Sequence, residues 1–198
     1  MTNKLEHVTS ANMPTKYGKF LIHGFKNVEN GEEHIALVKG EINPEEAILT
    51  RIHSECLTGD ALGSARCDCG DQYDAAMKMI ASEGKGILVY LRQEGRGIGL
   101  INKLKAYELQ DRGLDTVEAN IELGFAPDLR DYSIGVEILK FLKTKKLRLM
   151  TNNPDKINGL EKYGIEIVER VAIETAYKAD CKDYMRTKKD KMGHILKN

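Results

Sequence analysis

Three cysteines that lie near one another in the sequence could bind a metal ion. Cys56, Cys67 and Cys69 form the pattern C-x10-C-x-C, whereas Cys181 stands alone. Zinc binds thiolates readily, and catalytic zinc sites hold three protein ligands and keep a fourth position open for water. The spacing therefore indicates a zinc site that could activate water. The alternative is three reduced, partly buried thiols without a metal, because free cysteines often pack as small apolar side chains.

Turn residues and arginines lie beside the cysteines. Asp60 and Gly70 flank the cluster, so we expect its ligands to lie on a loop. Arg51 and Arg66 are close in the sequence. Guanidinium groups bind phosphate with two parallel hydrogen bonds, and the pattern therefore suits a substrate that carries phosphates.

A glycine-rich segment, residues 92–99, follows a predicted strand and precedes a predicted helix. Backbone N–H groups at such a junction bind phosphate. The segment lacks the Gly-Lys-Ser/Thr of a Walker A loop, and Leu100 stands where the dinucleotide-binding pattern needs its third glycine. The alternative is a tight turn with incidental arginines.

Two later segments carry similar chemistry. Residues 128–131 place a carboxylate and a guanidinium two positions apart, and residues 151–156 combine a hydroxyl, amides and an ammonium group. Each alone could be a helix cap or a surface ion pair. Several anion-binding loops in one small domain favour a single polyanionic ligand.

The composition is that of a folded protein: of 198 residues, 41% are hydrophobic and 30% are charged. Its 30 basic and 30 acidic residues cancel, which argues against a nucleic-acid partner. The first residues lack the apolar core of a signal peptide, and no run approaches the roughly 20 apolar residues that span a membrane. We therefore expect a cytoplasmic protein without a membrane partner.

The elements that must position these residues change character along the chain. The N-terminal part predicts strands at 19–25, 34–39 and 47–52, with a turn at Asn30-Gly31. Strands and helices then alternate. The predicted helices are 71–83, 100–112, 133–142 and 154–163, and the predicted strands are 86–91, 146–150 and 165–168. This pattern predicts a mixed α/β fold, a single compact domain over residues 1–174, followed by a polar, Lys-rich segment at 175–198 whose order the composition leaves open.

Long motifs in the expected order resemble GTP cyclohydrolase II, the enzyme family that opens riboflavin biosynthesis. The resemblance covers roughly residues 14–172 and a short C-terminal match. The matching segments are 51–60, 66–70, 92–100, 115–120, 123–125, 128–131, 151–154 and 191–194. One departure is Ala172, where the family usually has proline.

The resemblance implies a set of site residues. Cys56, Cys67 and Cys69 match the zinc ligands. Asp128 matches the proton acceptor, Arg130 the nucleophile and Tyr107 a tyrosine near the reacting base. For Tyr107 the residues alone favour core packing, because Leu100 and Leu104 share its helical face. The positions that match GTP contacts are Arg51, Ile52, His53, Ser54, Glu55, Gln72, Glu94, Gly95, Arg96, Thr116, Thr151 and Lys156.

The implied reaction is hydrolysis of GTP to formate, pyrophosphate and 2,5-diamino-6-ribosylamino-4(3H)-pyrimidinone 5′-phosphate. The resemblance also implies one Zn2+ per chain, Mg2+ with the triphosphate, and a homodimer. For Arg130 a plainer role is to stabilise charge on the α-phosphate, because a guanidinium with a pKa above about 12 stays protonated. Two alternatives are a paralogue that acts on another nucleotide with the same zinc site, and a structural zinc module without turnover.

Overall fold

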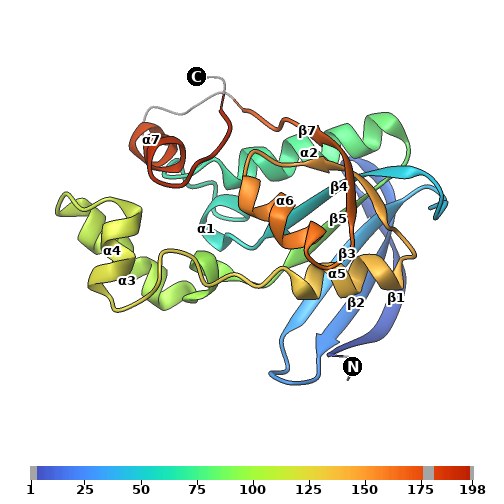
Figure 1. Ribbon diagram of the computed structural model, residues 1–198, viewed down its shortest axis with the longest axis horizontal. Helices are drawn as coiled ribbons and strands as arrows, with labels where there is room; N and C mark the ends of the chain where they lie inside the picture. The colour runs from blue at the N-terminus through green and yellow to red at the C-terminus, as the bar shows by residue number, and fades with distance from the viewer. Residues whose placement is uncertain (1–3, 176–180, 197–198) are drawn as a thin grey trace. The chain divides into compact units, whose positions relative to one another are not determined.

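The computed structural model describes residues 4–175 and 181–196 of the chain (Figure 1). Contacts within the chain group it into two compact units. Unit 1 comprises residues 1–53, 74–92 and 132–173, and unit 2 comprises residues 54–73, 93–131 and 174–198. Each unit is therefore assembled from three separate segments of sequence.

The described residues of unit 1 form one seven-stranded sheet in the order β1-β2-β3-β5-β4-β6-β7 (Figure 1). The pairs β1–β2, β2–β3 and β3–β5 are antiparallel, whereas β4–β6 and β6–β7 are parallel. The strands are β1 (Leu5–Thr15), β2 (Gly18–Asn27), β3 (Glu33–Lys39), β4 (Ala47–Ser54), β5 (Gly86–Leu91), β6 (Lys146–Met150) and β7 (Glu166–Val171).

Helices cover this sheet. Helices α5 (Ser133–Phe141) and α6 (Pro154–Glu161) pack their apolar residues into the main core with alternate residues of the strands. Helix α2 (Cys69–Glu83) also lies on the sheet, since a Cβ added to Gly86 at the start of β5 would lie 3.0 Å from Ile80 of this helix. Both sides of the central strands are thus buried, which explains their continuous apolar sequences.

The predicted elements of unit 1 are confirmed. The strand at 86–91 and the strand at 146–150 have the predicted bounds. Asn153 caps α6 as expected, because its side chain accepts a hydrogen bond of 2.9 Å from the Asp155 N–H. Strand β1 was missed because Leu5 is its one fully buried residue, and a mostly exposed strand lacks apolar alternation.

The described part of unit 2 is helical and carries the glycine-rich segment. Its elements are α1 (Leu57–Asp60), the short 3-10 helix η1 (Glu94–Gly97), α3 (Leu100–Asp111), α4 (Thr116–Glu122) and α7 (Lys182–Asp190). Helix α3 was predicted, whereas α1, α4 and α7 were not. Helix α4 begins with a capping box in which Asp115 and Glu118 accept each other's backbone N–H groups, a signal visible in the sequence.

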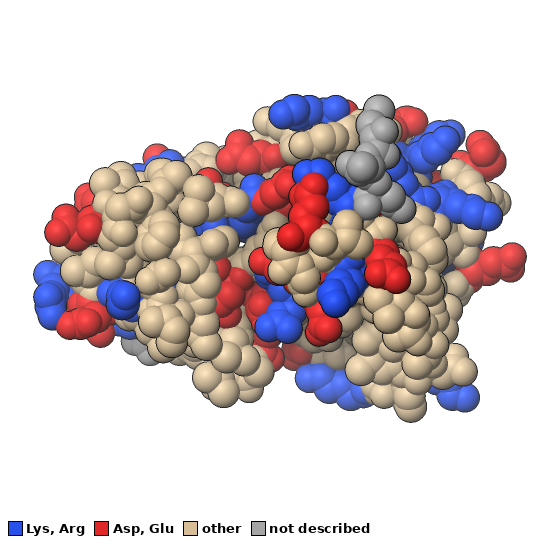
Figure 2. Space-filling model, turned by 90° about the horizontal axis from the view of Figure 1, so that it is seen from below, with Lys and Arg blue, Asp and Glu red and all other residues tan. Residues whose placement is uncertain are grey.

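The predicted mixed α/β class is confirmed. The grouping of the chain into two compact units was not predicted. Helix α7 lies in the C-terminal segment whose order was left open, and residues 176–180 and 197–198 of that segment lie outside the described residues. Among the described residues, no helix is long and apolar enough to cross a membrane. Figure 2 shows basic and acidic side chains interspersed on the face drawn, in keeping with zero net charge.

Candidate functional site

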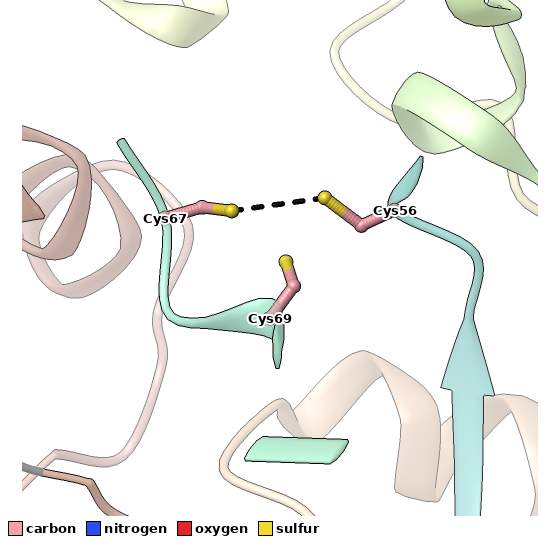
Figure 3. A group of neighbouring side chains, drawn as sticks. All are labelled: Cys56, Cys67 and Cys69. Carbon is pink, nitrogen blue, oxygen red and sulfur yellow. Dashed lines mark hydrogen bonds between the residues drawn. The ribbon is translucent and has the colours of Figure 1, made fainter. Parts of the chain in front are cut away.

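The three cysteines predicted as metal ligands come together in unit 2. Their Sγ atoms all lie within 4.8 Å of one another and point toward a common centre (Figure 3). Cys56 Sγ and Cys67 Sγ are 3.7 Å apart. A tetrahedral zinc ion with Zn–S bonds of about 2.3 Å holds its sulfurs about 3.8 Å apart, so the spacing fits zinc. Within the described residues no histidine or carboxylate joins the group. Three protein ligands are the number that catalytic zinc sites use.

Two glycines let the backbone fold tightly enough to gather the thiols. A Cβ added to Gly70 would lie 2.2 Å from the carbonyl oxygen of Gly59. A Cβ added to Gly59 would lie 2.9 Å from Cys67 Sγ. A larger residue at either position would therefore force its surroundings to move. The Cys56 N–H donates a 3.0 Å hydrogen bond to Asp60, which fixes the start of α1.

A buried lysine that the sequence analysis did not single out contacts the cluster. Lys103 Nζ of α3 donates to Cys56 Sγ at 3.1 Å and to Glu94 Oε1 at 2.7 Å. Lys103 and Glu94 are only 8% and 9% exposed. The other oxygen of Glu94 accepts the Leu57 N–H at 2.6 Å. Burying a charged group is costly unless the group is paired, and this network holds the Lys103 ammonium against the Cys56 thiol.

The charges around the thiols set their proton affinities. Hydrogen bonds with Cys67 and Cys69 lower the pKa of Cys56, and Lys103 lowers it further. The hydrogen bond to Cys56 raises the pKa of Cys67 to about 11 and raises that of Cys69 well above its ordinary value. Burial opposes the charge of Lys103, but Glu94 and Cys56 outweigh it and raise its pKa. The charge of the cluster is thus favoured at Cys56, whereas Cys67 and Cys69 hold their protons more tightly.

A cavity of about 100 Å³ adjoins the cysteines within unit 2. Its walls combine apolar surface with groups that can bind anions or transfer protons. Cys56, Cys69, Glu94, Arg96, Tyr107 and Arg130 contribute to its lining. Among the other predicted residues, Ser54, Glu55, Gly95 and Thr116 also line it.

Tyr107 faces the site and not a hydrophobic core. Leu104, which shares its helical face, is 45% exposed, and the buried residues of α3 are Lys103 and Ala106. The Tyr107 hydroxyl lies 3.3 Å from Thr58 Oγ1, and the Arg66 guanidinium stacks 4.8 Å from the ring centre. The core-packing interpretation is therefore wrong. Burial raises the pKa of Tyr107, so its hydroxyl keeps its proton at neutral pH.

Asp128 and Arg130 form a multiply bonded pair. Arg130 Nε donates to both carboxylate oxygens of Asp128, at 2.9 and 3.1 Å, and the Arg130 N–H donates to Oδ1 at 3.0 Å. Burial opposes ionisation of Asp128, but Arg130 overcomes it and holds the pKa of Asp128 below its ordinary value. The pair is a carboxylate beside a charged guanidinium, a geometry suited to binding a phosphate group.

The glycine-rich segment is a strained turn joined to this pair. Arg96 has a φ of +66°, in the left-handed region that non-glycine residues rarely adopt. The Leu129 N–H donates to the Arg96 carbonyl at 3.1 Å, and a Cβ on Gly97 would lie 3.2 Å from Leu129. Arg96 and Arg130 are therefore positioned together, as lining residues of one cavity. Gln72 instead donates to Asp68 at 2.6 Å.

The remaining predicted residues belong to unit 1, at the carboxyl ends of β4 and β6 and in the first turn of α6. Arg51 Nη1 donates to the Met150 carbonyl at 2.8 Å, and Lys156 Nζ donates to the Ile52 carbonyl at 2.7 Å. The His53 ring stacks on Tyr90 at 5.4 Å. Thr151 Oγ1 accepts the Asn153 N–H at 3.1 Å. The carboxyl ends of parallel strands are the usual place for ligand contacts in α/β sheets.

Comparison with known proteins agrees with these features. The family model described as GTP cyclohydrolase II matches residues 6–172. A GTP cyclohydrolase-2 of Tolumonas auensis is 58% identical over 189 residues, which are 96% of each chain. Riboflavin biosynthesis proteins RibBA of Chlorobium phaeovibrioides and Bacillus subtilis are 56% and 54% identical over 97% and 99% of this chain. The chain spans about half the length of these two relatives, 47% and 50%.

One solved structure shows a related fold. It is RibBX of A. baumannii, a two-domain 3,4-dihydroxy-2-butanone 4-phosphate synthase, with a TM-score of 0.50 and 22% identity. The match covers 87% of this chain and 41% of that one, and it concerns the fold alone. The family match and the identity to the Tolumonas relative, over nearly the whole of both chains, show that the chain belongs to the GTP cyclohydrolase II family.

Proposed function

We propose that this chain hydrolyses GTP to formate, pyrophosphate and 2,5-diamino-6-ribosylamino-4(3H)-pyrimidinone 5′-phosphate, the first step of riboflavin biosynthesis. The observation that supports it most is the cysteine cluster, spaced for zinc and offering three protein ligands, beside a cavity lined by Arg96, Arg130 and Tyr107. Two arginines suit the phosphates of a nucleotide, and a metal site beside them suits hydrolysis.

Cys56, Cys67 and Cys69 would hold the zinc ion. When bound, zinc supplies Lewis acidity and lowers the pKa of water toward 7, which permits hydrolysis at neutral pH. The Lys103 ammonium, 3.1 Å from Cys56 Sγ, withdraws negative charge from that ligand. With zinc bound, this contact would leave the metal more electrophilic than three thiolates alone would.

Arg130 would bind the α-phosphate and stabilise the charge that develops there. Its bonds to Asp128 orient the guanidinium and favour its protonated form, which supports a role as a phosphate clamp rather than as a nucleophile. Arg96 would bind a neighbouring phosphate, and Mg2+ would accompany the triphosphate.

Tyr107 would act on the base. Its protonated hydroxyl can donate a hydrogen bond to the formylated intermediate or relay a proton to the departing amine. Arg66, stacked on the ring, and Thr58, beside the hydroxyl, restrict where that hydroxyl points.

The other predicted substrate contacts in unit 1 are Arg51–His53, Thr151 and Lys156, and their assignment to GTP rests on the family motifs. The proposal also includes a homodimer, which the family resemblance implies, and a cytoplasmic location.

The deciding experiment incubates zinc-loaded protein with GTP and Mg2+ and measures formate and pyrophosphate in the same samples. We expect both products, together with the diaminopyrimidine, and no formate from the protein that lacks zinc. Parallel reactions with ATP and ITP test base selectivity. A zinc-loaded, folded protein that releases neither product from GTP would overturn the proposal. If the protein opens the ring of another purine nucleotide faster than that of GTP, that nucleotide is the substrate instead.

A further inference from the structure

A buried ion pair joins the C-terminal helix to the loop that carries two of the cysteines. Lys188 Nζ of α7 donates to Asp68 Oδ1 at 2.5 Å, and the two side chains are only 9% and 4% exposed. Asp68 stands between Cys67 and Cys69 in the sequence. Lys188 lies beyond residues 6–172, the span that matches the family model.

Asp68 organises the turn that presents the two thiols. Its second carboxylate oxygen accepts from Gln72 Nε2 at 2.6 Å, and its carbonyl accepts the Gln72 N–H at 2.9 Å. A carboxylate between two thiolate ligands adds negative charge where negative charge already gathers. Burying it there requires a cation, and Lys188 supplies one.

Further contacts attach α7 to the rest of unit 2. The Lys188 ammonium also lies 4.5 Å from the centre of the Tyr184 ring, and Tyr184 lines the same cavity as Cys69. Lys191 pairs with Asp115 and donates to Glu118 at 2.9 Å, at the start of α4. Helix α7 is thus fixed at Lys188 and at Lys191, which holds the Lys188 ammonium in place against Asp68.

We propose that Lys188 is a positioning residue of the metal centre: by pairing with Asp68 it keeps the Cys67-Asp68-Cys69 turn in the conformation that binds zinc. The inference rests on the zinc site of the proposed function and assigns a part in forming that site to the C-terminal helix α7. Lys188 is not among the residues that line the cavity, and it acts through the carboxylate of Asp68, between the two cysteines. Groups that orient metal ligands typically contribute 10- to 100-fold to metal affinity.

The test is a zinc-binding measurement without GTP, by competition with a chromophoric chelator. We expect Lys188→Met to weaken zinc affinity by roughly 10- to 100-fold. Lys188→Arg keeps the positive charge and should therefore retain most of the wild-type zinc affinity. Lys189→Met is the matched control, since Lys189 is an exposed neighbour on the same helix. The zinc affinity of the Lys189→Met variant should equal that of the wild type. The absorption bands of Co2+-substituted protein should change for Lys188→Met alone, because they report thiolate geometry.

A double-mutant cycle separates positioning from a general effect on folding. If Lys188 acts through Asp68, then in an Asp68→Asn background Lys188→Met should change zinc affinity less than about twofold. If the single Lys188→Met variant fails to fold, Lys188→Gln takes its place in the cycle. Wild-type affinity in folded Lys188→Met, or an equal loss in both backgrounds, would overturn the proposal. A wild type that binds zinc but leaves GTP intact would overturn the proposed function and not this one.

Discussion

The strands of unit 1 and the surroundings of the cysteines in unit 2 are stabilised by different kinds of interaction. Ile87, Val89, Leu147 and Leu149 are completely buried in the sheet core. Around the cysteines the buried groups are instead charged, as in the Lys103–Glu94 and Lys188–Asp68 pairs. Apolar packing has no preferred direction and adds up with area, whereas a buried ion pair fails when either partner is removed.

This difference separates stability from metal binding. Substitutions in the sheet should lower the free energy of unfolding and leave the zinc affinity of folded protein unchanged. Substitutions near the cysteines should lower the zinc affinity of the folded protein in addition to any effect on stability, because these groups are arranged around a site and not around a large apolar core. Four measurements test that division, in order of decreasing expected effect.

The largest effect is expected from Leu149→Ala in β6. Removing this fully buried side chain leaves a cavity among close-packed neighbours, which should lower the free energy of unfolding by about 2–5 kcal/mol. Urea unfolding measures the loss, and chelator competition on the folded protein should give wild-type zinc affinity. Val168→Ala is the control, because Val168 is 54% exposed in β7 and its truncation should lower the free energy of unfolding only slightly. A comparable loss of zinc affinity in Leu149→Ala would contradict the division.

The next effect is expected from Gly70→Ala. The added methyl would lie 2.2 Å from the Gly59 carbonyl, so the backbone must move and the thiols must separate. Overpacking of this kind costs about 1–3 kcal/mol of folding stability. We expect zinc affinity to fall as well, because the turn that presents the thiols must move. Gly24→Ala in β2 is the control, since its methyl would make an ordinary contact at 3.5 Å. Equal zinc affinity in the two variants would show that the Gly59–Gly70 approach does not shape the site.

The same division explains what the sequence could predict. Apart from the mostly exposed β1, the sheet strands and the helices that cover them have apolar residues at regular spacing, and their bounds were predicted closely. The cysteine cluster was predicted because ligand type and spacing are local properties. The roles of Lys103 and Lys188 were not predicted, because each lysine lies in a polar helical sequence typical of an exposed surface. Their partners, Cys56 and Asp68, lie 47 and 120 residues away in the sequence.

Lys103→Met should weaken zinc binding by about 10- to 100-fold. It removes the cation that contacts both Cys56 Sγ and Glu94, and it leaves that carboxylate buried without its ammonium. Lys105→Met on the exposed side of α3 is the matched control and should bind zinc normally. Chelator competition measures both variants. Tight zinc binding by Lys103→Met would mean that the hydrogen bond to the thiol contributes nothing to the metal site.

The smallest effect concerns a polar group inside unit 1. His34 of β3 is 1% exposed, and its Nδ1 accepts the Arg92 N–H at 3.2 Å, which requires an unprotonated ring nitrogen. Burial lowers the pKa of His34 below its ordinary value, although Glu32 partly opposes the shift. The unfolded chain therefore binds a proton more readily than the folded one. The stabilisation is complete above about pH 6.5 and is lost as the pH falls below that value.

Urea unfolding at a series of pH values should show this loss. The free energy of unfolding should decrease by at most about 1.4 kcal/mol for each pH unit below 6.5 on account of His34. His34→Gln, which cannot be protonated, should reduce the slope. The substitution should not abolish the pH dependence of unfolding, because burial also lowers the pKa of His23 in β2. The zinc affinity of His34→Gln should match the wild type at pH 7.5. An unchanged slope would mean that His34 titrates alike in the folded and unfolded chain, and unit 1 would then owe its acid sensitivity to other groups.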